Sequence, residues 1–505
     1  MTLRSVWVYN RTSFYEMGCE QFMLAIDKSA DDFLYRQVID LITENIDSGT
    51  LRPGDRLPSL RRMSKRIDVS IPTVRQAYIE LERQRRVESR PQSGFYVRGL
   101  NANELVRPAP RFRQSNKPVP VANRSLMDRV YEGLHQPDFV PLGIANPCMA
   151  KPAAKALHRA MKRVMARAEE RSIGYAPSMG EPGLRRQIAF RYLDTIGSNV
   201  EPDNICITNG AQEALLLALQ AVASKGDVIA VESPTYHGLL ELIGSLGMLA
   251  IEVETCPEEG VTLSALRKTL DAHPVKVCLF STTLNNPLGV SMPDDMRQEL
   301  VNIIDERELV LIEDDVYGDL LFDGHRPKPA EMYSRSGNVL TCGSFSKTAA
   351  PGYRIGWLLA GRYRDAIMRL KRSYSCSSGL LQQLTLTEFL ASGTYDRYLK
   401  TLRPVLQQNA QRTRALVAQH FPEGTRTSKP VGGAVLWIEL PGNVNSAHLF
   451  DEAINKGISI APGLIFSPCA RYENFMRLSF GHPWSEEIEQ SIVWLGRKVQ
   501  ELAGR

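Results

Sequence analysis

One lysine, in the segment SFSKTAAPGYRIG (residues 344–356), has the surroundings of a covalent cofactor site. Lys347 follows an apolar run, lies among hydroxyl side chains, and is followed seven positions later by Arg354. A lysine amine forms a Schiff base with an aldehyde, and Ser344, Ser346 and Arg354 can hold a phosphate, the arginine through a forked contact. These residue types predict a pyridoxal 5'-phosphate site with Lys347 as its catalytic residue.

The ends of other apolar runs have residues that suit the same cofactor. The segment TNGAQEAL places Gly210, Ala211 and Gln212 at a helix start, where free N–H groups and the helix dipole favour phosphate. Tyr236, in SPTYHG, offers an aromatic face for stacking on a pyridine ring. We therefore expect both segments at one ligand site.

Two more segments offer polar groups for the ring. Asn286, in LNNPLG, can donate to the ring hydroxyl oxygen, and Tyr317, in EDDVY, can bond the same oxygen. Asp314 can pair with the pyridinium nitrogen and keep the ring protonated as an electron sink. Each motif alone is also consistent with a turn, a cap or a buried packing residue. The presence of all five motifs in one chain, in this order, favours a pyridoxal 5'-phosphate site over those alternatives.

From about residue 129 onward, short β-rich runs alternate with helical runs, and these elements must position the candidate cofactor residues. The runs NICIT, DVIAV, VKVCLF, LVLIEDD, NVLTCGS and RIGWLLA predict strands, with helical patterns between several of them. The alternation predicts an α/β domain over residues 129–505, with a mainly parallel sheet, helices on both faces and a smaller C-terminal lobe. Ligands bind at the carboxyl ends of such strands.

Residues 31–97 have a different pattern. Leu34, Val38, Ile42 and Ile46 recur every four positions and predict a helix that Asp31 or Asp32 starts and Gly49 ends. Ser59 is expected to cap a second short helix through Arg66, with Asp68 in a left-handed bend. Ser70 caps a third helix with Pro72 in its first turn. VESRPQSGFYV then predicts two strands around a turn, which completes a winged helix-turn-helix.

This small domain has the charge expected of a DNA-binding module. Between residues 61 and 125 there are 15 Lys and Arg against 5 Asp and Glu, whereas the whole chain has a net charge of +5. The alternative is a protein-interaction module with a solvated charged face. The residues that we expect to contact phosphates or base edges lie on the second helix, the third helix and the wing: Arg61, Arg62, Ser70, Thr73, Arg75, Gln76, Tyr78, Arg90 and Ser93.

Length and composition set the remaining limits. The chain has 505 residues, 43% of them hydrophobic, and no apolar stretch long enough for a membrane span. The first residues lack the apolar region of a secretion signal, and the 8 cysteines form no Cys-x-x-Cys pair, so we expect a cytoplasmic protein without a metal site. Residues 1–30 show no clear pattern. Residues 98–128 are predicted to be a linker, and the ~28 Pro-, Asn- and Arg-rich residues of its part 98–125 could reach ~85 Å.

The N-terminal pattern resembles the DNA-binding domain of the GntR family of bacterial regulators. The resemblance lies in LYRQ, SGTLRPGDRLPSLRRM, VSIPTVRQAYIELERQ and SRPQSGFYV. The family usually has a glycine between the third helix and the wing, and this chain has Gln84, Arg85 and Arg86 there. We therefore expect a longer or strained helix exit.

The order and spacing of the cofactor motifs resemble the fold-type I aminotransferases over about residues 140–505. The resemblance implies that Tyr175 reaches the cofactor phosphate of a partner subunit, and that Arg477 grips a substrate α-carboxylate. Ala145 stands where the family usually has glycine, and alanine does not let the backbone approach a ligand as closely, a departure that bears on amino-acid turnover more than on cofactor binding.

The two pieces in this order resemble the MocR subgroup of GntR regulators. The resemblance implies a pyridoxal-phosphate-responsive transcription factor that binds operator DNA and is nucleoid-associated when bound. It also implies a head-to-tail homodimer in which each small domain rests on the other subunit.

Two interpretations of the function follow. In one, the large domain senses pyridoxal phosphate or an amino acid and controls DNA binding. In the other, the chain is an active aminotransferase with an accessory DNA-binding domain. A purely metabolic enzyme leaves residues 31–97 unexplained.

Overall fold

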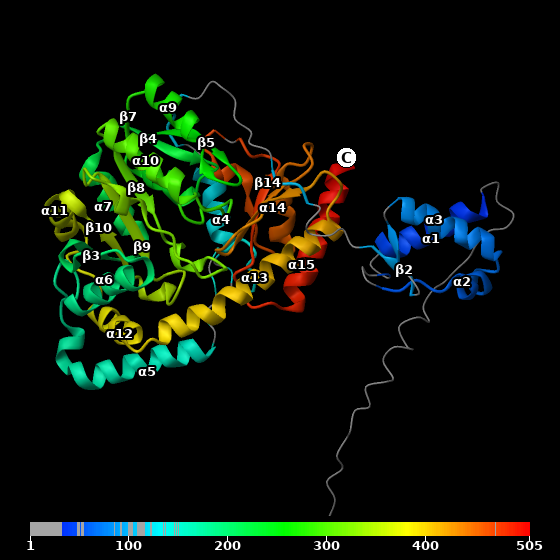
Figure 1. Ribbon diagram of the computed structural model, residues 1–505, viewed down its shortest axis with the longest axis horizontal. Coiled ribbons are helices and arrows are strands. Elements are labelled where there is room, and N and C mark those ends of the chain that lie inside the picture. Colours follow the sequence, from blue (N-terminus) through cyan, green and yellow to red (C-terminus); the bar gives the residue numbers. More distant parts are fainter. Residues whose placement is uncertain are drawn as a thin grey trace, which may run out of the picture. The chain divides into compact units, whose positions relative to one another are not determined.

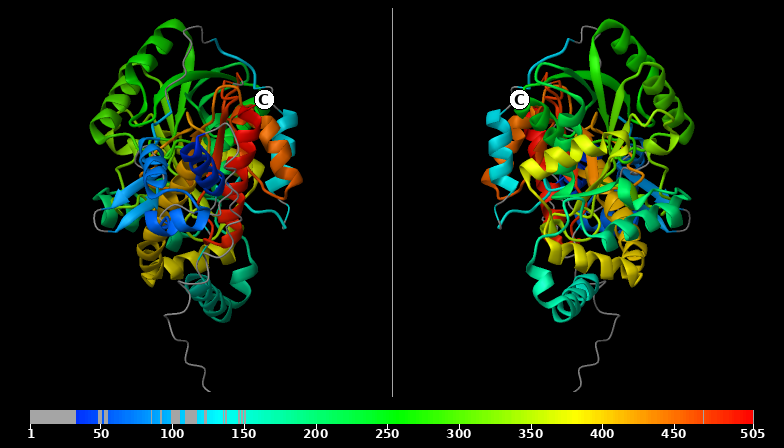
Figure 2. Two further views of the ribbon diagram at one scale, coloured as in Figure 1. Left: turned by 90° about the vertical axis from the view of Figure 1, so that its right-hand side faces the viewer. Right: turned by 90° about the vertical axis from the view of Figure 1, so that its left-hand side faces the viewer.

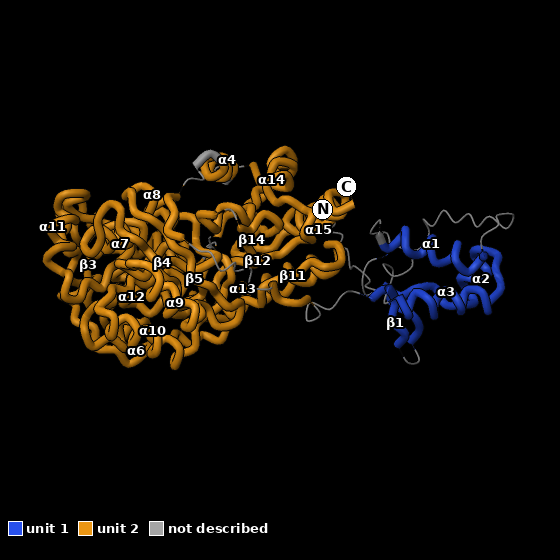
Figure 3. The backbone as a smooth tube through the Cα atoms, turned by 90° about the horizontal axis from the view of Figure 1, so that it is seen from above, with its two compact units in different colours: residues 1–101 blue, residues 102–505 orange. Residues whose placement is uncertain are grey.

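The computed structural model divides the chain into two compact units, residues 1–101 and residues 102–505 (Figure 3). The structure describes residues 33–47, 51, 55–84, 86–90, 93–98, 105–108, 117–121, 124–134, 136, 138–145, 147, 149, 151–469 and 471–504. The predicted cap at Asp31 or Asp32, the predicted stop at Gly49 and the whole of segment 1–30 lie outside the described residues.

The small unit is a winged helix-turn-helix, as the sequence predicts. Its elements are α1 (Leu34–Asp47), α2 (Leu60–Ile67), α3 (Ile71–Arg83), β1 (Val87–Arg90) and β2 (Gly94–Val97). The Ser59 hydroxyl accepts from Arg62 N, and the Ser70 hydroxyl accepts from Thr73 N, so both predicted caps form. Asp68 takes the predicted left-handed bend at φ 52°.

A single apolar core holds these elements together. Val38 and Ile42 of α1 pack with Met63 of α2, Val74 of α3 and Val87 of the wing. Strands β1 and β2 pair antiparallel, with Val87 opposite Val97. The expected strain at the helix exit does not occur at Gln84, which ends α3 at φ −74° and ψ 2°. Arg85 lies outside the described residues.

The large unit is built on an eight-stranded sheet (Figure 1). Five of its strands (β4, β5, β7, β8 and β9) run parallel to one another, β10 is antiparallel to both of its neighbours, and β6 is antiparallel to β5. In spatial order the strands are β3 (Ile205–Thr208), β10 (Gly356–Leu359), β9 (Val339–Ser344), β8 (Val310–Asp314), β7 (Val275–Phe280), β4 (Val228–Ser233), β5 (Leu249–Cys256) and β6 (Gly260–Val261).

Helices cover both faces of this sheet because alternate strand residues point to opposite faces. In β4, Ile229 and Val231 join one core cluster, and Val228 and Ala230 join another. The first cluster includes residues of α7 (Gly210–Val222), α8 (His237–Ser245) and α11 (Arg364–Tyr374), and the second includes residues of α9 (Leu263–Ala272) and α10 (Asp294–Glu306). The predicted α/β architecture is confirmed.

The remaining elements form the flanking helices and the C-terminal lobe. Its four-stranded sheet has the order β11 (Arg426–Thr427), β12 (Val435–Glu439), β14 (Phe475–Ser479), β13 (Ala461–Pro462). Figure 2 shows α4 in cyan beside α14 in orange, and Arg129 of α4 pairs with Asp451 of α14. The helices are α4 (Arg124–Leu134), α5 (Lys151–Ala168), α6 (Pro182–Ile196), α12 (Leu380–Ala391), α13 (Thr394–His420), α14 (Ser446–Asn455) and α15 (Glu486–Ala503).

The segment predicted to be a linker, residues 98–128, is partly bound to the large unit. Val119 exchanges two backbone hydrogen bonds of 2.9 Å with Ala250 on β5, and Thr427 N donates to Val106 O at 3.1 Å. Helix α4 already begins at Arg124. The free part of the linker is therefore shorter than its sequence suggests. Within the described residues, no helix combines the length and apolarity needed to cross a bilayer.

Candidate functional site

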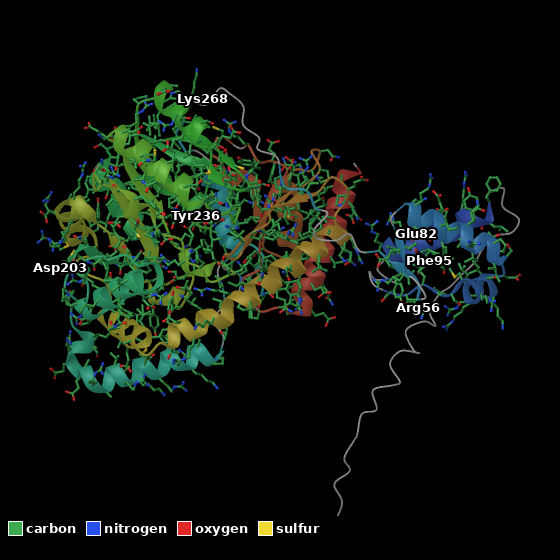
Figure 4. The ribbon with its side chains drawn as sticks, viewed as in Figure 1. Arg56, Glu82, Phe95, Asp203, Tyr236 and Lys268 are labelled. Atoms are coloured by element: carbon green, nitrogen blue, oxygen red, sulfur yellow. The ribbon has the colours of Figure 1, made fainter. Side chains whose placement is uncertain are left out.

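The carboxyl ends of the sheet strands surround a pocket of about 230 Å³. Strands β4, β7, β8 and β9 end at or just before four of its lining segments, so parallel strands bring segments from distant parts of the chain to one edge. Most of the predicted cofactor and substrate residues line this pocket: Ala211, Gln212, Tyr236, Asn286, Asp314, Tyr317, Ser344, Ser346, Lys347, Arg354 and Arg477. Figure 4 labels Tyr236 inside the large unit.

Lys347 follows β9 and points into the pocket. Its ammonium donates to the backbone oxygen of Ala145 at 2.8 Å. Burial, together with the nearby Arg477, lowers the pKa of Lys347 to about 8. A lysine with this pKa is a much better nucleophile near neutral pH than an exposed one.

The start of α7 and the residues after β9 form a phosphate-sized cradle. Gly210 has φ +76°, where a side chain is strained, and a Cβ there would have to displace the Arg354 guanidinium. Arg354 donates to the Ser346 hydroxyl at 3.2 Å and to Asn209 O at 3.4 Å, and the Ser344 hydroxyl donates to that of Ser346 at 2.9 Å. Hydroxyls, a guanidinium and a helix start together suit a phosphate dianion.

The groups predicted to contact the cofactor ring are buried beside this cradle. Burial raises the pKa of Asp314 to about 6, and the backbone N–H of Val316 and the positive charge of Lys347 act in the opposite direction. A protonated ring nitrogen would add a cation that favours the Asp314 carboxylate. The Tyr317 hydroxyl donates to Ala145 O at 3.1 Å. Ala145, the residue that departs from the family pattern, thus offers its carbonyl to both Lys347 and Tyr317.

Arg477 is a buried cation without a carboxylate partner among the described residues. Its side chain is 2% exposed, and it donates to Asn286 Oδ1 at 3.1 Å and to Gly143 O. Its Nε is buried and makes no hydrogen bond in the described structure. Burial lowers the pKa of Arg477, which is the effect expected when a charge lacks an anion. An anionic ligand would satisfy this group.

Several pocket residues could not be found from sequence motifs. Tyr131 of α4 lies in the pocket wall, and its hydroxyl donates to Glu241 Oε2 at 2.8 Å and lies 3.4 Å from His237 Nδ1. His237 is fully buried, which lowers its pKa well below the ordinary value. Its place directly after Tyr236 is the one clue that the sequence offers. Tyr131 is more than 100 residues from both partners in sequence, and no spacing rule joins them.

Tyr175 does not line this pocket. It is 89% exposed, and the neighbouring Ile173 is 86% exposed. A large exposed aromatic beside an exposed isoleucine is unusual for a protein surface that stays in water. The contact of Tyr175 with a partner's cofactor remains a prediction.

The candidate DNA-contacting face is formed by α2 and α3. Arg61, Arg62, Arg75 and Gln76 are exposed, and none of these three arginines forms an ion pair with a described residue. The exposed Ser70 caps α3, and its hydroxyl also lies 2.7 Å from that of the half-buried Thr73. Free guanidiniums on one side of a helix-turn-helix suit phosphate contacts.

Tyr78 is a correction to the predicted DNA contacts. Its side chain is 0% exposed, its ring packs edge-on against Phe95 at 5.1 Å, and its hydroxyl donates to Pro58 O at 2.9 Å. Tyr78 falls on the inner face of α3 because it follows buried Val74 by four positions. It therefore belongs to the core of the small unit.

At the wing, the predicted contacts already have partners in the protein. Arg90 pairs with Glu88 at 2.7 Å, and its guanidinium lies 4.3 Å from the Tyr96 ring centroid. The Ser93 hydroxyl lies 2.6 Å from that of Tyr96. Arg90 is still half exposed, so a phosphate contact would have to compete with Glu88.

Comparison with known proteins separates the same two regions. Residues 137–492 match the family model of aminotransferase class I and II, and residues 34–97 match that of the gntR family of bacterial regulatory proteins. Two Escherichia coli (strain K12) proteins align over nearly their whole length. The HTH-type transcriptional regulator YjiR is 35% identical over 92% of this chain and 98% of its own, and the HTH-type transcriptional regulator YdcR is 36% identical over 92% and 99%.

The large unit is also similar to solved aminotransferases. The crystal structure of LysN, the α-aminoadipate aminotransferase of Thermus thermophilus complexed with N-(5'-phosphopyridoxyl)-L-leucine, has a TM-score of 0.69 and 26% identity. The alignment covers 76% of this chain and 96% of that one. The two Escherichia coli regulators therefore align with both the small and the large domain of this chain. The solved aminotransferase aligns with the large unit.

Proposed function

Because the chain belongs to the HTH-type transcriptional regulators that join a GntR domain to a class I and II aminotransferase domain, we propose that pyridoxal phosphate at Lys347 controls its binding to DNA. The chain is a pyridoxal-phosphate-dependent regulator of transcription. Its large domain supplies the sensor, and its small domain supplies the contact with the operator. We expect it in the cytoplasm, at the nucleoid when bound to DNA.

The buried Arg477 is the observation on which the sensing proposal chiefly rests. It lines the same pocket as Lys347, and no carboxylate of the described residues neutralises it. A buried cation of this kind favours a ligand with a carboxylate. We therefore propose an amino acid as the effector that joins the cofactor, with its α-carboxylate at Arg477.

The cofactor fits the residues present. Ser344, Ser346 and Arg354, with the start of α7, would hold its phosphate, and Asp314 would hold its ring nitrogen. When bound, the protonated ring supplies an electron sink. The protein's own contribution is a lysine with a lowered pKa and hydrogen-bond donors held by the surrounding elements.

We propose that the regulator is a head-to-tail homodimer. Exposed Tyr175 and Ile173 would be covered in such a dimer, and Tyr175 would contact the partner's cofactor phosphate. In a dimer the two small domains can contact the two half-sites of an operator. A ligand that changes the relative placement of the two small domains can therefore control operator binding.

The test begins with capture of genomic DNA by the full-length protein, with and without pyridoxal phosphate. We expect enrichment of one operator class whose occupancy changes with the cofactor. The Lys347→Ala variant should lose the cofactor's visible absorbance and its effect on occupancy. If the variant and the parent give the same occupancy at every cofactor concentration, sensing through Lys347 is refuted.

A second candidate function is transamination. The pocket retains Lys347, Asp314 and Arg477, which are the groups that an aminotransferase needs. Incubation of the protein with individual amino acids and 2-oxoglutarate should show whether glutamate accumulates. Sustained turnover would make the chain an enzyme with an accessory DNA-binding domain, and single-turnover or no conversion would leave the sensor.

A further inference from the structure

A second cavity, of about 240 Å³, adjoins the cofactor pocket. Helices α4 and α8 line it with Met127, Asp128, Leu240 and Glu241, and Ile465 adds an apolar side chain. One hydrogen bond connects the two spaces, because Tyr131 of the cofactor pocket donates to Glu241 of the second cavity at 2.8 Å. A side chain that displaced the Tyr131 hydroxyl would therefore meet the Glu241 carboxylate.

The lining residues of this cavity define what it can hold. Most of the described lining is apolar, and its charged side chains, Asp128 and Glu241, are both acidic. Asp128 is exposed, so the cavity reaches solvent there. An apolar stem with a cationic end matches such a space, because the stem is removed from water and the cation meets carboxylates.

We propose that this cavity receives the cationic side chain of a diamino acid whose α-carboxylate lies at Arg477. The proposal rests on the proposed function, since it requires an amino-acid effector at the cofactor. The distal ammonium takes the place of the Tyr131 hydroxyl as the donor to Glu241. Its positive charge makes that hydrogen bond stronger than the one it replaces.

The same cavity is lined in part by the segment that connects the large domain to the small one in sequence. Val121 lines it, and the segment 117–121 that ends at Val121 is fixed to β5 by the Val119–Ala250 hydrogen bonds. Helix α4, which follows directly, contributes both Tyr131 and Met127. A ligand in the cavity thus contacts the part of segment 98–128 that is bound to the large unit. Binding there would bias how the linker leaves the large domain.

The experiment compares L-lysine with L-norleucine, which has the same straight chain without the ammonium. Each is titrated calorimetrically into the full-length protein loaded with pyridoxal phosphate. We expect L-lysine to bind about tenfold more tightly. Glu241→Gln keeps an acceptor for Tyr131 but removes the charge, so it should weaken L-lysine about tenfold and leave L-norleucine unchanged. Asp194→Asn, an exposed carboxylate on α6, is the matched control and should change neither.

Equal affinities for the two amino acids would overturn the proposal, and so would an equal loss of both in Glu241→Gln. A change in oligomeric state with Glu241→Gln, without any lysine preference, would mean that the partner subunit covers the cavity, and it would also overturn the proposal. Failure of the proposed function can be told apart from failure of this cavity proposal. In that case the protein would lack cofactor absorbance or DNA binding even before any amino acid is added.

Discussion

At the scale of single residues, burial sets the chemistry of the pocket. Burial lowers the pKa of both Lys347 and Arg477, and the nearby Arg477 adds to the cost of a positive charge on Lys347. A pKa of about 8 gives Lys347 a larger neutral fraction near neutral pH than an ordinary lysine has, and burial leaves Arg477 in need of an anion. The two effects have one cause, which is the removal of both groups from water.

The lowered pKa of Lys347 predicts how fast the cofactor attaches as pH changes. Only the neutral amine attacks an aldehyde, so the rate should rise with pH up to about 8 and then level off. An ordinary lysine would continue to accelerate up to about pH 10. Stopped-flow absorbance of the apoprotein mixed with pyridoxal phosphate measures this. A rate that is still rising tenfold per pH unit above 9 would contradict the buried environment.

Two neighbours on α3 should behave oppositely on DNA. Arg75→Ala should weaken operator binding and lower the slope of log affinity against log salt by about 1, because one phosphate contact is lost. Tyr78→Phe should leave DNA binding unchanged and cost about 1 kcal/mol of stability, because it removes the buried hydrogen bond to Pro58. Fluorescence anisotropy and thermal unfolding separate the two effects. Loss of DNA affinity in Tyr78→Phe alone would return that residue to the interface.

At the scale of elements, the start of α7 and the loop after β9 are one unit. Gly210 turns the chain at φ +76° directly against Arg354, so the backbone conformation and the anion-binding side chain depend on each other. This dependence makes the turn a specific test of the phosphate cradle.

Gly210→Ala should lower cofactor affinity by tenfold or more. It adds about 1 kcal/mol of backbone strain and also displaces Arg354. Gly226→Ala is the matched control, because Gly226 has φ +89° with no atom within 4 Å of the added carbon. The control should lose similar stability and keep its cofactor affinity. Equal affinities in the two variants, measured by absorbance titration, would show that the cradle does not hold the phosphate.

The sequence predicts elements whose periodicity or capping is local. The caps at Ser59 and Ser70, the bend at Asp68 and the strands before Lys347 and Asp314 are of this kind. It does not reveal that β10 runs antiparallel between β3 and β9, because a strand's direction depends on its neighbours. Nor does it place Tyr131 beside Glu241, because that contact exists only after α4 folds back onto α8. The sequence also misplaces Tyr78, because a polar aromatic on a helix suits either face.

At the scale of the whole molecule, the proposed regulator requires two subunits. A cofactor site that takes Tyr175 from its partner is incomplete in one chain, and the exposure of Tyr175 agrees with this. The proposed dimer would also pair the two DNA-binding domains, so that sensing and DNA binding would share one assembly.

Co-expression of two inactive variants tests the shared site. Tyr175→Ala and Lys347→Ala homodimers should both bind the cofactor poorly or not at all. A mixed dimer restores one complete site, with Lys347 from one subunit and Tyr175 from the other. We expect absorbance titration to find one cofactor per mixed dimer at near-parental affinity. No recovery in an isolated mixed dimer would exclude the contribution of Tyr175 across the interface.

The central claim is that the cofactor attached at Lys347 sets the affinity for DNA. The most direct measurement is the operator affinity of the full-length protein, at fixed salt, as pyridoxal phosphate is titrated into the apoprotein. We predict a change in affinity that saturates at one cofactor per subunit and that is absent in Lys347→Ala. An operator affinity that stays constant while the cofactor's absorbance saturates would contradict the claim.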